Sequence, residues 1–239
     1  MKIEFKNLAD SALLCEVDLK ASKETSQYIL SLDKSINDAA KSLPIKGIVE
    51  TIPAFTTILI KYNISECSNK ALREHITKIA QNISFQGSKS KLLEIPVCFD
   101  QTYGLDLEKI SQLTSLSNDD IANIILDKEY FVYMLGFMPG FAFMGDVDKR
   151  LFQPRLREPR IKVPEGSVAI ANNLTCIYPF ASPGGWNLVG RTPIKLWDIN
   201  RDPKILLNPG DTVKYKQISR NEYIDIKEKS SKDSQFLTQ

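Results

Sequence analysis

Residues 131–198 read FVYMLGFMPGFAFMGDVDKRLFQPRLREPRIKVPEGSVAIANNLTCIYPFASPGGWNLVGRTPIKLWD, and this stretch decides the fold. Of the chain's 11 glycines and 12 prolines, seven of each fall inside it, together with both tryptophans. Each Gly or Pro favours a particular backbone conformation, so the stretch is dense in turns. Its aromatic side chains must pack against the surfaces that those turns create.

Short apolar runs between Gly and Pro turns continue through this stretch and beyond it. Such spacing predicts an all-β sandwich or barrel. The turn 208–211 has Pro209 and Gly210 at the two central positions of a type II turn. The predicted strands are Phe131–Leu135, Ser167–Ala171, Leu174–Tyr178, Asn187–Val189, Ile194–Trp197 and Thr212–Lys216.

The first 90 residues alternate between strand and helix patterns. Apolar positions recur at helical spacing after Ser22, a predicted N-cap, and again over 69–83. Strands are predicted at Ala12–Val17, Gly47–Ile52 and Thr56–Tyr62, with Leu92–Phe99 as a further strand. This order predicts a ferredoxin-like α+β unit.

The segment Gln86–Lys91 is polar and has no periodicity, as expected of a linker. We therefore expect a first domain over residues 1–88 and a second over 89–222, followed by a polar C-terminal tail at 223–239. Within the second domain, Leu107 and Ile110 indicate a short helix, and Ser117 with Asp120 forms a capping box before the next one.

Composition excludes several classes of protein. The chain has 239 residues, 43% of them hydrophobic, and a net charge of only +2 from 31 basic and 29 acidic side chains. This balance argues against nucleic-acid or anionic-membrane partners. No apolar run approaches the roughly 20 residues of a membrane helix. The opening MKIEFKNLAD has no apolar core of a signal peptide, so we expect a cytoplasmic protein.

Cysteine and histidine limit the chemistry further. Cys15, Cys67, Cys98 and Cys176 are far apart, so a disulfide framework or a Cys-based zinc site is not expected. A Ser-His-Asp triad would have to use the single histidine, His75, which lies at the edge of a helix's apolar stripe. No metal site is predicted, and no catalytic residue is identified.

Three motifs resemble one protein family. GFMPGFAFMGD, PRIKVPEGSVAIA and IYPFASPGGWNLVGRTP are similar to the allophanate hydrolase subunit 1 family, and LEIPVCFDQTYGLDL resembles its domain junction. That family includes a kinase-inhibitor protein of sporulating bacteria and the B subunit of bacterial ATP-dependent 5-oxoprolinase. The same region forms half of the carboxyltransferase domain of urea carboxylase.

The resemblance implies a ferredoxin-like N-terminal domain and a cyclophilin-like β-barrel C-terminal domain. It also implies a non-autonomous enzyme subunit that opens 5-oxoproline to L-glutamate with ATP hydrolysis. It would act with the 5-oxoprolinase subunits A and C, the latter being the carboxyltransferase-like partner half. The resemblance also implies ATP as a cofactor, bound at an interface between subunits. Neither a GxxxxGK[ST] loop nor a GxGxxG turn is present, so this chain alone does not show how a nucleotide would bind.

Two other functions stay open. The chain could bind and inhibit a sensor histidine kinase, or it could be a subunit acting on allophanate or another amide. Binding to a kinase without binding to the carboxyltransferase-like partner half would favour the first. A prolyl isomerase is the least favoured reading of a cyclophilin-like barrel, because nothing here resembles that active site.

Each candidate motif has a structural and a functional interpretation. The glycines of the SPGGW motif either form a turn before a core tryptophan or admit a ligand carboxylate to the backbone. Arg191 either binds an anion or pairs with an acid such as Asp198 or Asp211. The arginines of PRLREPR lie either in an exposed loop or in a site for an anion or a partner subunit.

The phenylalanines around Pro139 either pack inside the barrel or form a wall for a flat ring. The candidate site residues are Pro139, Phe141, Arg155, Arg160, Tyr178, Ser182, Gly184, Gly185, Trp186 and Arg191.

The sequence departs from the family pattern at three places. Ile125 stands where the family usually has His, and Leu105 where it has Pro before the junction's Asp. A Gly-rich turn and Gln-Thr-Gly are replaced by Asn172, Asn173, Leu174, Thr175 and Cys176. Asn tolerates positive φ, so the turn is expected to survive. These changes are expected near the barrel surface and put the family's activity in question.

Overall fold

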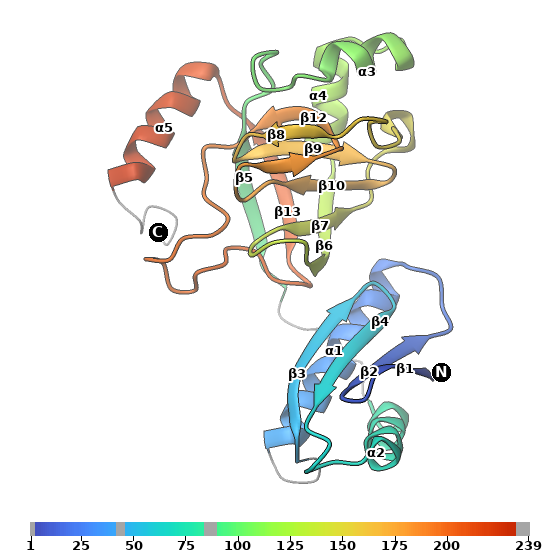
Figure 1. Ribbon diagram of the computed structural model, residues 1–239. Coiled ribbons are helices and arrows are strands. Elements are labelled where there is room, and N and C mark those ends of the chain that lie inside the picture. The colour runs from blue at the N-terminus through green and yellow to red at the C-terminus, as the bar shows by residue number, and fades with distance from the viewer. Residues whose placement is uncertain (1–2, 42–45, 84–89, 233–239) are drawn as a thin grey trace. The chain divides into compact units, whose positions relative to one another are not determined.

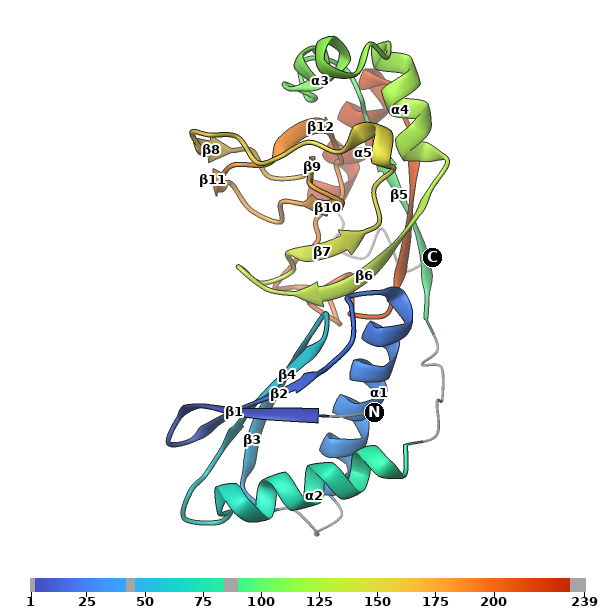
Figure 2. The same cartoon turned by 90° about the vertical axis from the view of Figure 1, so that its right-hand side faces the viewer.

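The computed structural model describes residues 3–41, 46–83 and 90–232, and divides into two compact units, Met1–Ser90 and Lys91–Gln239 (Figures 1 and 2). The fold is mixed α and β, as predicted. The predicted domain boundary after residue 88 lies outside the described residues, as does most of the predicted linker.

The first unit is a four-stranded antiparallel sheet with two helices. The strand order is β1-β2-β4-β3, so β4 lies between β2 and β3, the two strands that α1 connects. Alternate residues of β2 and β4 are buried against α1 and α2, which gives the unit its own core. Its elements are β1 (Ile3–Ala9), β2 (Ala12–Val17), α1 (Lys23–Lys41), β3 (Ile48–Ala54), β4 (Thr57–Tyr62) and α2 (Asn69–Gln81).

The prediction that Leu92–Phe99 supplies a strand to this arrangement is wrong. The fourth strand is β1, and β5 (Leu92–Val97) pairs in parallel with β13 (Thr212–Gln217) in the second unit. Strand β1 escaped prediction because only Ile3 and Phe5 of it are half-buried, so the alternating pattern is too short to recognise.

The second unit is built on a seven-stranded sheet of order β12-β9-β10-β7-β6-β13-β5, which is nearly closed and barrel-like. Its closure is a pair of hydrogen bonds between Cys98, just after β5, and Arg191, the last residue of β12. The Cys98 N–H donates to the Arg191 oxygen at 2.9 Å, and the Arg191 N–H donates back at 3.0 Å. Gly190 permits this approach, because a Cβ there would lie 2.9 Å from the Cys98 oxygen.

Besides β5 and β13, the strands of this sheet are β6 (Glu129–Leu135), β7 (Ala142–Gly145), β9 (Ser167–Ala171), β10 (Leu174–Ile177) and β12 (Asn187–Arg191). The elements outside it are α3 (Leu107–Thr114), α4 (Asn118–Leu126), the 3₁₀ turn η1 (Lys149–Leu151), β8 (Arg160–Val163), β11 (Ser182–Gly184) and α5 (Arg220–Lys232). Strands β8 and β11 form a separate two-stranded ribbon. Helix α5 continues where a polar tail was expected from residue 223, and Tyr223 on it is buried.

The prediction of a strand at Ile194–Trp197 is wrong apart from one bridge between Trp197 and Ile205. The guanidinium of Arg201 donates to the backbone oxygens of Lys195 and Leu196, at 2.9 and 3.0 Å. The Leu196 oxygen also accepts from the Leu206 N–H at 2.9 Å beside that bridge, so a single bridge and a side chain stand where a strand was predicted.

Strand β9 is buried on both faces, and this decides where the site lies. Val168 and Ile170 face the main core with α3 and α4, whereas Ala169 and Ala171 face a second, aromatic cluster. Because side chains alternate along a strand, the same sheet separates the two clusters.

The capping box at the start of α4 is present as predicted. The Ser117 hydroxyl oxygen accepts from the Asp120 N–H at 3.0 Å, and the Asp120 carboxylate accepts from the Ser117 N–H at 3.1 Å. Ser117→Ala is expected to lower the free energy of unfolding of the second unit by about 1 kcal/mol. Urea unfolding followed by tryptophan fluorescence measures this, because both tryptophans lie in that unit. Ser117→Thr should retain most of the stability, and an equal loss in both variants would contradict the capping role.

Candidate functional site

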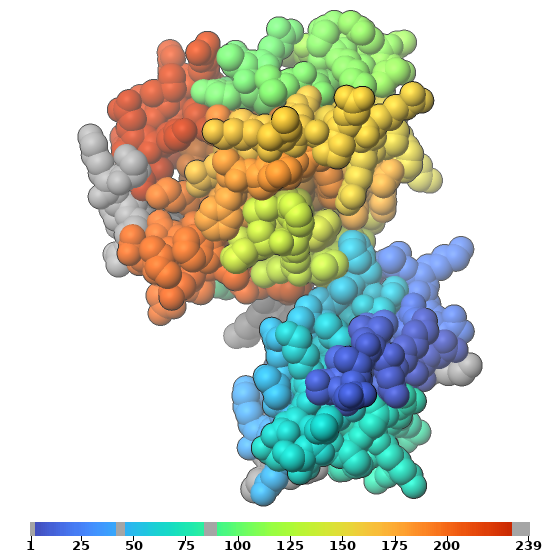
Figure 3. All heavy atoms as spheres, viewed as in Figure 1, coloured from blue at the N-terminus to red at the C-terminus, as the bar shows by residue number. Residues whose placement is uncertain are grey.

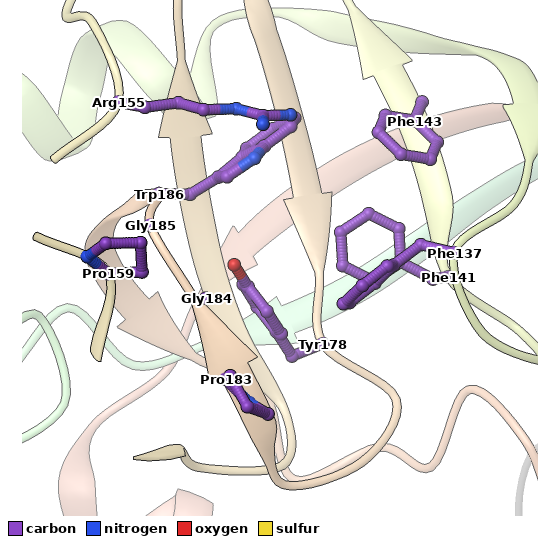
Figure 4. A pocket seen from close by; sticks show the side chains of 10 residues that line it. All are labelled: Phe137, Phe141, Phe143, Arg155, Pro159, Tyr178, Pro183, Gly184, Gly185 and Trp186. Atoms are coloured by element: carbon purple, nitrogen blue, oxygen red, sulfur yellow. The ribbon is translucent and has the colours of Figure 1, made fainter. Parts of the chain in front are cut away.

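The aromatic cluster opens into a pocket of about 310 Å³ between the sheet and the β8–β11 ribbon. The loop before β7 and the turn between β11 and β12 supply opposite walls, with Tyr178 just after β10 between them (Figure 4). Its lining residues are Phe137, Phe141, Phe143, Arg155, Pro159, Tyr178, Pro183, Gly184, Gly185 and Trp186.

The rings of this pocket hold one another edge to face. Phe141 meets Tyr178 at 5.2 Å and 90° between ring planes, and Trp186 at 6.3 Å and 86°. Phe143 lies 6.0 Å from Trp186. Such pairs favour a fixed arrangement. The wall is therefore preformed, although it packs on the opposite face of the sheet from the main core and not inside the barrel.

Phe137 lies at the rim of the pocket. Its backbone has φ of 70°, its side chain is 69% exposed, and its ring lies 5.4 Å from that of Phe141. A bulky side chain rarely adopts positive φ, so this conformation is strained. Strain of this kind is found at binding sites more often than elsewhere, which is consistent with a rim that contacts a ligand.

Two polar groups face the otherwise apolar pocket. The Arg155 guanidinium lies 5.9 Å from the Trp186 ring centroid, in a cation–π contact. Burial raises the pKa of the Tyr178 phenol well above its ordinary value, so the hydroxyl stays protonated at neutral pH. The pocket thus offers one cation and one hydroxyl against flat hydrophobic walls, which suits a small ring that carries an anionic group.

Gly184 is required by its contact with Tyr178. A Cβ at this position would lie 2.3 Å from the Tyr178 hydroxyl oxygen and 2.8 Å from two ring carbons. At Gly185 the nearest atom to a Cβ would be a Pro159 carbon at 3.6 Å, an ordinary contact. The first glycine of the SPGGW motif therefore shapes the pocket sterically.

Arg160 was expected beside Trp186 but is not among the pocket's lining residues. It donates to Asp106 at 2.7 Å, and the second oxygen of that carboxylate accepts from the Leu188 N–H at 2.6 Å. Asp106 is buried, and within the described chain the other amino group of Arg160, Nη1, is buried without a hydrogen-bond partner. The carboxylate at the start of α3 thus joins β8 through Arg160 and β12 through the Leu188 N–H.

Arg191 also lies outside the aromatic pocket. Its Nε donates to the Glu165 backbone oxygen at 2.7 Å. The structural alternative for Arg191, a salt bridge to an acid such as Asp198 or Asp211, is absent within the described residues. Asp198 instead lies 3.9 Å from Lys195, and Asp211 accepts backbone N–H groups.

The remaining candidates play local roles. The Ser182 hydroxyl donates to the Pro183 oxygen at 3.3 Å, and Pro139 does not line the pocket. Pro159 and Pro183 line it without having been predicted. The sequence could have indicated both prolines, because each lies inside a motif, PRLREPR or SPGGW, and beside a predicted site residue.

The family departures fall in two environments. Asn172 has φ of 54°, so the turn before β10 survives as predicted. Ile125 is 1% exposed in the main core. The expectation that it lies near the barrel surface is therefore wrong.

Ile125→His is expected to destabilise the second unit by about 3 kcal/mol, since it removes buried apolar contacts and buries an imidazole among Ile, Leu and Val side chains. Urea unfolding measures the change. Leu113→His, at a 62% exposed position on α3, should change stability little. An unchanged midpoint in Ile125→His would contradict the buried placement.

The residues that the structure describes contain no group of three or more His, Cys, Asp and Glu side chains that could hold a metal ion. None of the helices there is long and apolar enough to cross a membrane. All four cysteines are buried and free.

Comparison with known proteins identifies relatives of the whole chain. The family model for the carboxyltransferase domain, subdomain C and D, matches residues 3–207. The B subunit of 5-oxoprolinase from Bacillus subtilis (strain 168) is 33% identical over 97% of this chain and 99% of that protein.

Two solved structures extend the comparison. The crystal structure of TTHA0988 matches with a TM-score of 0.75 and 30% sequence identity. The match covers 87% of this chain but only 40% of the longer TTHA0988 chain. The crystal structure of Kluyveromyces lactis urea carboxylase matches with a TM-score of 0.78 and 24% sequence identity. The match covers 95% of this chain and 22% of the urea carboxylase chain. The second likeness shows the fold alone.

Proposed function

This chain belongs to the family of carboxyltransferase subdomains C and D, and from that premise we propose that it is the B subunit of an ATP-dependent 5-oxoprolinase. The observation that carries this conclusion is the end-to-end match to the B subunit of the Bacillus subtilis 5-oxoprolinase, at 33% identity over 99% of that protein. The enzyme would open the lactam ring of 5-oxoproline to L-glutamate.

We propose the aromatic pocket as the place where 5-oxoproline binds. Its volume of about 310 Å³ and its aromatic walls suit a flat five-membered ring. Arg155 would bind the substrate carboxylate, and Trp186 would lie along the ring. The preformed walls would hold the lactam in one orientation.

An unstrained amide resists hydrolysis, because resonance leaves its carbonyl carbon weakly electrophilic. Transfer of a phosphoryl group from ATP to the lactam oxygen would make that carbon electrophilic. In this scheme the pocket binds, orients and excludes water. The protonated Tyr178 hydroxyl could donate a hydrogen bond to a substrate oxygen.

We propose that the site is completed by partner chains, subunits A and C, and that ATP binds at an interface between subunits. Relatives support the idea of a partner, since this chain matches only 40% of the TTHA0988 chain and 22% of urea carboxylase. The same fold is thus joined to further polypeptide in those proteins. A cytoplasmic location is proposed because ATP is consumed and the four cysteines are free thiols.

The finer fold assignments are also proposals. The placing of β4 between β2 and β3 supports a ferredoxin-like first unit in which β1 takes an edge position. The nearly closed sheet supports a cyclophilin-like second unit.

Arg155→Met is expected to raise KM for 5-oxoproline roughly tenfold, because a charged hydrogen bond to the carboxylate is lost. The value of kcat should stay near that of wild type. Arg157→Met is the matched control, since Arg157 is exposed in the same segment and does not line the pocket. Steady-state kinetics of the assembled complex measures both. Equal KM values in the two variants would contradict the role of Arg155.

Co-expression with subunits A and C tests the proposed function. The complex should hydrolyse ATP only when 5-oxoproline is present, and omission of this chain should remove that activity. Equal activity without the chain would refute the proposal. Binding to a histidine kinase, and not to the carboxyltransferase-like partner half, would instead favour the kinase-inhibitor alternative.

A further inference from the structure

A second pocket, of about 90 Å³, lies between the end of β12 and helix α5. It shares no lining residue with the aromatic pocket. One wall comes from the loop that follows Arg191, and the other from Tyr223, Lys227 and Ser230. These three residues are spaced as i, i+4 and i+7, so they lie on one face of α5. Figure 3 shows α5 in red spheres beside the rest of the unit.

Three cations line this small space. They are Arg191, Lys195 and Lys227, and the only acidic lining residue is Glu165. Lys195 lies 3.9 Å from Asp198, at the outer limit of an ion pair, and Lys227 has no ion pair within the described residues. The pocket therefore carries an excess of positive charge that the surrounding chain does not neutralise.

Arg191 is held in a fixed orientation. Its backbone makes the two hydrogen bonds that close the sheet, and its Nε donates to the Glu165 oxygen at 2.7 Å. Its guanidinium lies 5.9 Å from the centroid of the Tyr103 ring. The two terminal nitrogens of the guanidinium have no hydrogen-bond partner among the described residues. They can therefore donate to two oxygens of a bound oxyanion.

The helix wall is fixed as well. Tyr223 is buried, and its ring lies 4.5 Å from that of Tyr103. The Lys227 ammonium lies 5.9 Å from the Tyr223 ring centroid. The two tyrosine rings, tilted by 36° to each other, thus each contact one cation: Arg191 lies over Tyr103 and Lys227 over Tyr223. In the loop, the Thr192 hydroxyl oxygen accepts from the Ile194 N–H at 3.2 Å. The proton of that hydroxyl is therefore free to be donated to a ligand.

We propose that this pocket is a second ligand site and that it binds the phosphate group of a phosphorylated ligand. A space of about 90 Å³ admits an oxyanion but not a nucleoside, so the rest of the ligand would extend outward. An excess of positive charge from three cations suits a dianion better than a carboxylate. The matched family region ends at residue 207, so the helix wall lies beyond it.

Titration calorimetry of the full chain with inorganic phosphate, at constant ionic strength, tests the proposal. Wild type should bind saturably, and Arg191→Gln and Lys227→Gln should each weaken binding at least tenfold. Lys229→Gln is the matched control, because Lys229 is exposed on the same helix but does not line the pocket. It should bind phosphate as wild type does. Thermal unfolding without phosphate checks that each variant is folded.

The same titration is repeated with acetate, and phosphate binding is measured in the presence of ATP. Acetate should bind at least tenfold more weakly than phosphate. Competition by ATP would identify a nucleotide as the source of the phosphate, and its absence would indicate free phosphate or another phosphorylated ligand. Three results would overturn the proposal: no saturable binding of phosphate, equal weakening in Lys229→Gln, or acetate binding as tight as phosphate. Because neither partner subunits nor 5-oxoproline is used, such a failure would leave the proposed function untouched.

Discussion

Replacing Gly184 with alanine is expected to lower kcat/KM for 5-oxoproline-dependent ATP hydrolysis about 100-fold, the effect of misplacing a positioning group by about 1 Å. The new Cβ would lie 2.3 Å from the Tyr178 hydroxyl oxygen. Tyr178 is 2% exposed and held edge-on by Phe141, so its ring can move only by disturbing the aromatic wall. Overpacking of this kind also costs about 1–3 kcal/mol of stability.

Gly185→Ala is the control for this prediction. It adds the same methyl group one residue later, where the nearest carbon of Pro159 would be 3.6 Å away. We expect near-normal stability and activity from this variant. Steady-state assays of the complex and urea unfolding of the chain measure the two effects separately. Full activity in Gly184→Ala would show that the pocket does not bind the substrate.

Replacing Asp106 with alanine is expected to cost about 3 kcal/mol of stability. The carboxylate is 6% exposed, lies 2.7 Å from Arg160 and accepts the Leu188 N–H at 2.6 Å. Its removal would leave a largely buried guanidinium and a buried N–H without partners. Arg160 is 26% exposed, so some of its charge would be solvated and the loss should lie at the lower end of the range for buried pairs.

Glu94→Ala is the matched control for an exposed ion pair. Glu94 lies 3.1 Å from Lys216 in the same unit, and both side chains are more than half exposed. Such pairs contribute little, so this variant should unfold at nearly the wild-type urea concentration. A similar small loss in Asp106→Ala would contradict the role of the buried carboxylate in joining the start of α3 to β8 and β12.

Local patterns predicted most of the secondary structure. Strand β9 was predicted with its observed bounds, because five consecutive buried residues lie between turn signals. The capping box at Ser117 was predicted from two residues and is present. Strand β8 was missed because only Val163 of its four residues is buried. A strand with one buried residue shows no hydrophobic alternation that a sequence pattern could reveal.

The site was predicted in part, for a similar reason. The motifs indicated Phe141, Gly184 and Trp186, which do meet in one pocket. Sequence alone placed Arg191 with them because it follows Trp186 closely. Strand β12 separates the two residues, and side-chain alternation and the closure at Cys98 turn Arg191 toward α5. Such placements depend on sheet closure, which no local pattern encodes.

The most direct test of the central claim is the crystal structure of the assembled complex with 5-oxoproline and a non-hydrolysable ATP analogue. We expect density for the lactam ring inside the aromatic pocket that Phe141 and Trp186 line, with its carboxylate at the Arg155 guanidinium. Density for 5-oxoproline in another subunit, with the aromatic pocket of this chain empty, would contradict it.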